Sequence, residues 1–149
     1  MPEVHFYHLE AFTLERALPP ILEKVMKRGW RAVVHTAGEE RTESLSAALW
    51  TFREESFLPH GTPRDGNAPR QPVWFTETGE EPNSPRVRVC VDGVPLGDPA
   101  GLERVIYVFD GRDPEALEKA RAEWKAARVS GHEVFYWQQD RDGKWSKKA

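Results

Sequence analysis

Cysteine is nearly absent from this sequence, with Cys90 the single thiol among 149 residues. One thiol can form neither an internal disulfide nor a cysteine-rich metal site, which indicates a reducing compartment. Long apolar runs are also missing, since no stretch approaches the roughly 18 apolar residues of a membrane span. Residues 1–10 carry two acids and two histidines where a signal peptide needs positive charge. We therefore expect a soluble cytoplasmic protein with no membrane partner.

A large excess of one charge sign is absent as well. The chain has 21 basic and 24 acidic side chains, for a net charge of −3, which excludes a strongly basic histone-like or ribosomal protein. The length of 149 residues predicts a single domain over residues 1–149. The charge is nevertheless segregated: residues 114–149 carry eight basic and six acidic side chains (+2), and residues 1–113 carry thirteen and eighteen (−5).

Apolar periodicity predicts alternating strands and helices. Leu14, Leu18 and Leu22 fall on one helical stripe after the capping residue Thr13, although Pro19 and Pro20 leave open a later start of this helix. Proline and glycine, which interrupt helices and strands, are frequent over residues 54–70, so we expect no regular element there. We expect a single α/β domain that contains a parallel strand-helix-strand crossover and a C-terminal hairpin. The predicted helices cover residues 14–28, 39–53 and 114–130, and the predicted strands cover residues 4–9, 31–36, 73–76, 86–91, 102–109, 133–139 and 144–147.

The motifs of nucleotide binding and of catalysis are missing. Gly38 is the single glycine of the turns at residues 10–13 and 37–40, so no GxGxxG or Walker loop opens a helix, and we expect no cofactor. His5 and His8 fall on opposite faces of a strand, and no other histidine spacing predicts a metal site. Cys90 has no nearby cation or helix N-terminus to activate it. These absences favour a non-catalytic protein, with a nucleotide-dependent α/β enzyme as the first alternative.

A basic and aromatic cluster stands out in the predicted helix at residues 114–130. Arg121, Lys125 and Arg128 are spaced four and three residues apart, so they share one helical face with Trp124. Arginine forks grip carboxylates and an indole offers an apolar ledge, so the cluster fits an acidic peptide with a hydrophobic end. The alternative is a solvated helix face whose Trp124 turns into the core, and the six tryptophans are expected mainly in the core.

Several segments together resemble the chi subunit of bacterial DNA polymerase III holoenzyme. They are residues 6–9 (FYHL), residues 45–61 (LSAALWTFREESFLPHG), the strand entry at Pro72, and residues 121–131 (RAEWKAARVSG). The ending HEVFYWQQDRDGKWSKK is similar to the longer form of the family in alphaproteobacteria. The resemblance implies an α/β, Rossmann-like three-layer sandwich with a mostly parallel sheet that binds no nucleotide. It also implies a role in DNA replication at the clamp loader.

The resemblance also implies partners and site residues. Chi binds the acidic C-terminal tail of single-stranded DNA-binding protein, and the matching positions here are Arg121, Trp124, Lys125 and Arg128. A separate surface of the family binds the psi subunit, and Trp50 and Phe57 match its aromatic positions. The alternatives are that they contact an equivalent clamp-loader partner or simply pack, and we expect a monomer or a 1:1 heterodimer. Leu117 stands where some members have a lysine. This predicts weaker electrostatic binding of the acidic tail, or binding that is shifted toward Lys144 and Lys147.

The second alternative is a direct single-stranded DNA-binding module that uses Trp124, Trp137 and the terminal lysines. The net charge of −3 does not favour it.

Overall fold

The computed structural model describes residues 2–51 and 60–149. Three α-helices and one 3₁₀ turn alternate with seven strands over this part of the chain. The helices are α1 (Leu14–Lys27), α2 (Glu39–Trp50) and α3 (Pro114–Val129), and η1 is the 3₁₀ turn Ala68–Arg70. The strands are β1 (Glu3–Leu9), β2 (Ala32–His35), β3 (Val73–Thr76), β4 (Val87–Cys90), β5 (Arg104–Asp110), β6 (Glu133–Gln139) and β7 (Trp145–Lys147).

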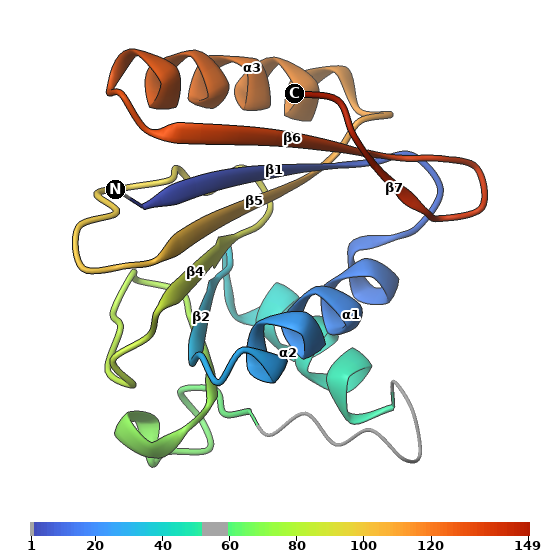
Figure 1. Cartoon of the computed structure of the whole chain (residues 1–149). Coiled ribbons are helices and arrows are strands. Elements are labelled where there is room, and N and C mark those ends of the chain that lie inside the picture. The colour runs from blue at the N-terminus through green and yellow to red at the C-terminus, as the bar shows by residue number, and fades with distance from the viewer. Residues whose placement is uncertain (1, 52–59) are drawn as a thin grey trace.

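The strands form one sheet in the order β3-β2-β4-β5-β1-β6-β7. All neighbours pair in parallel except β6 and β7, which form the expected antiparallel hairpin. Helices α1 and α2 pack together on one side of the sheet, and α3 lies beside β6 on the other side (Figure 1). The predicted α/β sandwich with a mostly parallel sheet is therefore confirmed.

Two apolar cores fill the space between these layers. One joins α1 and α2 to the sheet, with Leu18 and Leu22 fully buried, and the other joins α3 to β1 and β5 through Phe6 and Ala120. The central strands are buried on both faces, as parallel strands covered by helices must be, and this explains why β5 is an almost continuous apolar run.

Helix α1 begins earlier than its prolines alone would suggest. Leu14 is its first residue, the Thr13 hydroxyl accepts a hydrogen bond from the amide of Arg16 at 3.3 Å, and Pro19 and Pro20 lie inside the helix. The later start that the prolines left open is therefore wrong. Burial of the apolar stripe on the sheet outweighs the backbone hydrogen bonds that the prolines cannot donate.

The proline- and glycine-rich segment contains regular structure in its described part. Its residues 54–59 lie outside the described residues, but η1 forms a turn at Ala68–Arg70, and Gly61 makes a β-bridge to Trp74. The expectation of no regular element over residues 54–70 was thus too strict.

The expectation that tryptophan sits mainly in the core holds for Trp74 and also for Trp30, Trp124 and Trp145, which are partly buried and pack against the two apolar cores. Trp74 is buried at 6% exposure, Trp50 is 57% exposed, and the four others are partly exposed. No helix in residues 2–51 and 60–149 is long and apolar enough to cross a membrane.

Candidate functional site

Helix α3 is fixed at its start by the sequence Asp113-Pro114. The Asp113 carboxylate accepts a hydrogen bond from the amide of Glu115 at 3.0 Å, and Pro114 occupies the first turn, where no backbone donor is needed. Buried Ala120 and Ala127 let the helix approach the sheet closely. Trp124 lies between them on the same stripe, so its ring is directed toward β1 and β6.

A groove of about 390 Å³ runs between α3 and the edge of the sheet. We call it the α3 groove. Helix α3 forms one wall, β1 and β6 supply the floor, and the residues that follow β7 close the other side. The backbone amide of Lys148 donates to the carbonyl of Tyr136 at 2.7 Å, which holds this last segment against β6. The lining residues are His8, Leu117, Ala120, Arg121, Trp124, Tyr136, Gln138, Lys148 and Ala149.

Aromatic rings order the floor of the α3 groove. The Trp124 ring meets Phe6 and Tyr136 edge-on, with centroids 5.4 and 5.5 Å apart. The Tyr136 hydroxyl lies 2.5 Å from Nδ1 of His8. Burial raises the pKa of Tyr136, and the nearby Arg121 guanidinium acts in the opposite direction. The floor is therefore a set of rings with fixed orientations, whose positions need no rearrangement to receive an apolar side chain.

The rim of the α3 groove is basic. Arg121 and Lys148 line it from opposite sides, and neither makes an ion pair within the described residues. Lys125 is exposed on the same helix but does not line the groove. The Arg128 guanidinium sits 5.9 Å from the centre of the Trp124 ring, at the outer side of the indole. An apolar floor under unpaired cations suits an anionic ligand with an apolar end.

The structure thus brings together two of the four residues predicted for this cluster, Arg121 and Trp124, in the groove itself. Lys125 and Arg128 lie beside it. The Trp124 ring packs on Phe6 in the core and also lines the groove, so its packing in the core does not remove it from the surface. Lys147 does not add a cation to the rim of the α3 groove, because its ammonium lies 4.9 Å from the Phe135 ring, on the opposite face of β6.

His8, Tyr136, Gln138 and Lys148 were not predicted from the sequence. They come together because β6 pairs in parallel with β1 and places Gln138 opposite His8 and Tyr136 opposite Phe6. The alternation of β6 does put Tyr136 and Gln138 on one face, but only the pairing register shows that this face meets α3.

A larger cavity, of about 460 Å³, opens at the carboxyl ends of β1 and β5, where doubly wound folds bind their ligands. Its charges are paired with one another. Arg41 contacts Glu15 and also lies 3.1 Å from Asp92, and Arg112 lies 2.8 Å from Asp110. The lining holds five acidic residues and three basic ones, so the charge that remains is negative and does not suit an anionic ligand such as a phosphate.

The backbone amides that would bind a phosphate in this type of fold already have an acceptor within the protein. The backbone amides of Glu10, Ala11 and Phe12, which follow β1, all donate to Oε1 of Gln139 at 2.9–3.2 Å. In nucleotide-binding relatives of this fold the corresponding amides receive phosphate oxygens. In the described ranges, no group of three His, Cys, Asp or Glu side chains could hold a metal ion.

Trp50 ends α2 on a different surface, far from the α3 groove (Figure 1). It is 57% exposed, and its ring centre lies 4.6 Å from that of His60. His60 is held in place by Ser46, whose Oγ lies 2.8 Å from Nε2 of His60. Phe57, the second aromatic predicted for this surface, lies outside the described residues.

Comparisons with known proteins point in one direction. A family model described as "DNA polymerase III chi subunit, HolC" matches residues 1–135. The chain is 26% identical over 109 residues to the "Probable DNA polymerase III subunit chi" of Rickettsia prowazekii (strain Madrid E), covering 73% of this chain and 66% of that protein. It is 36% identical over 50 residues to the "DNA polymerase III subunit chi" of Pseudomonas aeruginosa, covering 33% of this chain and 35% of that protein. Less than two thirds of either relative's own length is thus matched.

Proposed function

The chain belongs to the DNA polymerase III chi subunit family, and from that premise we propose that it is a non-catalytic replication adaptor whose α3 groove binds the acidic C-terminal tail of single-stranded DNA-binding protein. In this role it links the clamp loader of the replicase to DNA that is coated with that protein. The observation that carries the proposal is the pairing of an ordered apolar floor with two cations, Arg121 and Lys148, that have no ion-pair partner in the described part of the chain.

The chemistry of such a tail matches both parts of the groove. An apolar terminal side chain would pack on Leu117, Trp124 and Tyr136, while carboxylates would accept hydrogen bonds from Arg121 and Lys148. Leu117 is apolar where some family members have lysine, so it extends the floor rather than the basic rim. Lys125 and Arg128 add attraction at longer range, which favours rapid encounter more than tight binding.

A second proposed surface contains Trp50, together with Phe57. An exposed indole at the end of a helix is a suitable anchor for a protein partner, and we assign this surface to psi or an equivalent clamp-loader subunit. The two surfaces lie on different elements, so one chain can hold both partners in the same complex.

Titration calorimetry with an acidic peptide that ends in Pro-Phe tests the tail proposal. We expect micromolar affinity at low salt for the wild-type chain and at least about fivefold weaker binding for Arg121→Ala, because a hydrogen bond to a charged group contributes about 1.5–3 kcal/mol. Arg141→Ala is the matched control, since Arg141 is exposed and does not line the groove.

The proposal fails if the wild-type chain shows no peptide binding at low salt. It also fails if Arg141→Ala weakens binding as much as Arg121→Ala does, because the attraction would then come from overall charge and not from the groove.

A further inference from the structure

A second groove lies on the opposite face of the sheet, between the C-terminal half of α1 and strands β1 and β5. It has a volume of about 330 Å³ and an apolar floor that includes Tyr7, Ile21 and Ile106. We call it the basic groove, because four of its lining residues are cations: Lys24, Lys27, Arg28 and Arg104. It shares no lining residue with the α3 groove.

Most of these cations are not neutralised by the protein. Lys24, Lys27 and Arg28 are exposed, and none of them has an ion-pair partner in residues 2–51 and 60–149. Arg104 pairs with Glu3 at 3.1 Å but keeps a buried Nε without a hydrogen-bond partner. Uncompensated cations above an apolar floor favour an anionic ligand that also carries apolar surface.

A row of aromatic rings continues from the basic groove across the edge of the sheet. On this face the His5 ring stacks on Phe135 at 4.6 Å, and the Trp137 ring is stacked 6.3 Å from both His5 and Tyr7. Trp145 meets Tyr7 edge-on at 5.0 Å. We call Tyr7, Phe135, Trp137 and Trp145 the ring row, and all four are partly exposed.

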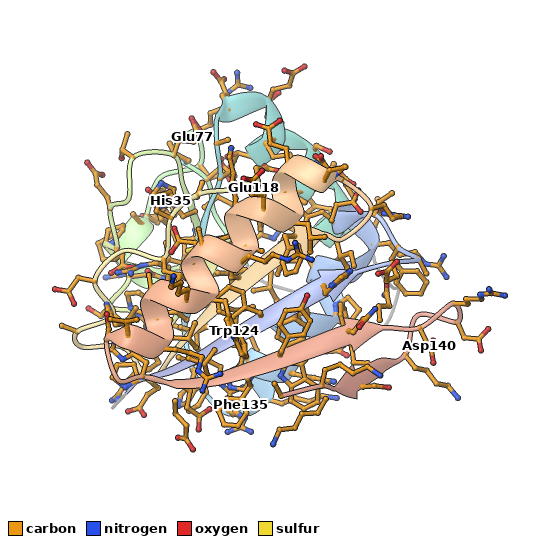
Figure 2. The ribbon with its side chains drawn as sticks, turned by 90° about the horizontal axis from the view of Figure 1, so that it is seen from above. His35, Glu77, Glu118, Trp124, Phe135 and Asp140 are labelled. Atoms are coloured by element: carbon orange, nitrogen blue, oxygen red, sulfur yellow. The ribbon has the colours of Figure 1, made fainter. Side chains whose placement is uncertain are left out.

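The ring row and the α3 groove occupy opposite faces of one strand. Figure 2 shows Trp124 and Phe135 on opposite sides of the β6 ribbon. This follows from the strand's alternation, which directs Tyr136 toward Trp124 and directs Phe135 and Trp137 toward His5. Helix α1 packs against β2 and β5, nearer the middle of the sheet, which leaves the rings of β6 and β7 accessible.

We propose that the basic groove and the ring row together bind single-stranded nucleic acid. The cations would contact the phosphodiester backbone, and the partly exposed rings would take unpaired bases by stacking or by edge-to-face contact. A duplex cannot offer base faces to these rings, because its bases are already stacked and paired. An acidic peptide would use the cations but has no repeating flat groups that match a row of four rings.

The charges around the ring row also suit single-stranded nucleic acid. Lys147 extends the basic character to β7, with its ammonium 4.9 Å from the Phe135 ring. Two carboxylates, Glu3 and Glu133, lie at the start of the paired strands β1 and β6, and Glu3 is engaged by His5 and Arg104. Trp137, Trp145 and Lys147 lie beyond residues 1–135, so this part of the surface lies outside the region that the family model matches.

Fluorescence anisotropy with labelled oligo(dT) and oligo(rU), each about 20 nucleotides long, tests the proposal. Contacts with three or four phosphates predict weak binding at low salt, with a slope of log affinity against log salt of about −2 to −3. The double variant Lys24→Glu/Lys27→Glu should bind at least tenfold more weakly. Its matched control is Lys125→Glu/Lys148→Glu, which makes the same change in net charge on the α3 side and should change oligonucleotide affinity less than twofold.

The variant Phe135→Leu tests the rings separately, because it keeps apolar volume but removes the aromatic ring that stacks on His5 and lies 4.9 Å from the Lys147 ammonium. We expect at least threefold weaker binding, and an unchanged affinity would show that bases do not contact the ring row. Comparison of the affinities for oligo(dT) and oligo(rU) shows whether the surface prefers single-stranded DNA or single-stranded RNA.

Four outcomes overturn the proposal: no binding of either oligonucleotide to the wild-type chain at low salt, unchanged affinity of Phe135→Leu, equal losses for the two lysine-pair variants, or loss of acidic-peptide binding in Lys24→Glu/Lys27→Glu. The last outcome would make the basic groove a peptide site. Failure here leaves the α3 groove untouched, because the peptide titration of Arg121→Ala is a separate measurement on the opposite face.

Discussion

At the residue scale, His5 shows how one buried side chain organises a surface. Its Nδ1 accepts a hydrogen bond from the Trp137 indole at 3.0 Å, and its Nε2 lies 2.9 Å from Glu3. The imidazole must therefore be neutral with its proton on Nε2, since a second proton on Nδ1 would face the indole N–H. Burial lowers the pKa of His5, against the opposing effect of Glu3.

This arrangement predicts a loss of stability in mild acid. A histidine with a lowered pKa binds protons more readily in the unfolded chain, so its contribution is complete above about pH 6.5 and falls as the pH drops toward the folded-state pKa. Urea unfolding at pH 7.5 and pH 5.5 should show a larger drop in the free energy of unfolding for the wild-type chain than for His5→Gln. Equal drops in the two proteins would mean that His5 does not titrate in this range.

Cys90 illustrates the opposite case, a titratable group with no apparent use. It is buried at the centre of the sheet, and burial raises the pKa of its thiol to about 12. The sequence predicted an unactivated thiol, and the direction of the pKa shift agrees, but the premise that no cation lies nearby is wrong: Arg88 acts to lower the pKa, and burial outweighs it.

At the scale of elements, the connection between β1 and α1 depends on a residue from the far end of the chain. Gln139 is buried at 2% exposure, and its Oε1 accepts hydrogen bonds from the three successive amides that follow β1. The same side chain reaches the carbonyl of Gly143 at 3.5 Å, so it also ties the β6–β7 hairpin to this connection.

Gln139→Ala should therefore destabilise the protein by about 2 kcal/mol, because it removes the acceptor of three partly buried amides. The neighbouring Gln138→Ala is the matched control, since Gln138 makes one hydrogen bond, to Glu10 at 3.3 Å, and should cost about 0.5 kcal/mol or less. Chemical denaturation of both variants checks this. Similar losses in the two proteins would show that the amides find other acceptors.

The elements themselves were largely predictable from the sequence. Thr13 and Asp113 mark helix starts, Asp142-Gly143 marks the hairpin, and apolar runs mark the buried strands. The prolines of α1 were ambiguous because their cost is local, whereas the burial that compensates it comes from tertiary packing. The role of Gln139 could not be predicted, because a glutamine near the end of a strand carries no signal for a contact more than 120 residues away.

At the scale of the whole molecule, the site was only half predictable. Spacing on α3 places Arg121 beside Trp124, but the groove also needs Tyr136 and Lys148, which reach α3 through the pairing of β6 with β1 and through the segment after β7. Similarly, Trp124 and Trp137 look like members of one aromatic group in the sequence, yet the sheet separates them: Trp124 meets Tyr136 on one face of β6, and Trp137 donates to His5 on the other. Pairing register decides such questions, and sequence periodicity does not.

The separation of these faces gives the near-neutral chain two distinct basic surfaces. The α3 groove combines cations with one apolar pocket, and the basic groove combines cations with a row of rings. The proposed adaptor would thus hold the DNA-binding protein by one face and contact nucleic acid with the other.

The most direct test of the central claim is an NMR titration of the six tryptophan indole N–H signals with the acidic peptide. Binding in the α3 groove predicts that the Trp124 signal shifts first and furthest, while the signals of Trp137 and Trp145 stay in place. A shift of Trp137 with an unmoved Trp124, or no shift of any indole at low salt, would contradict the account.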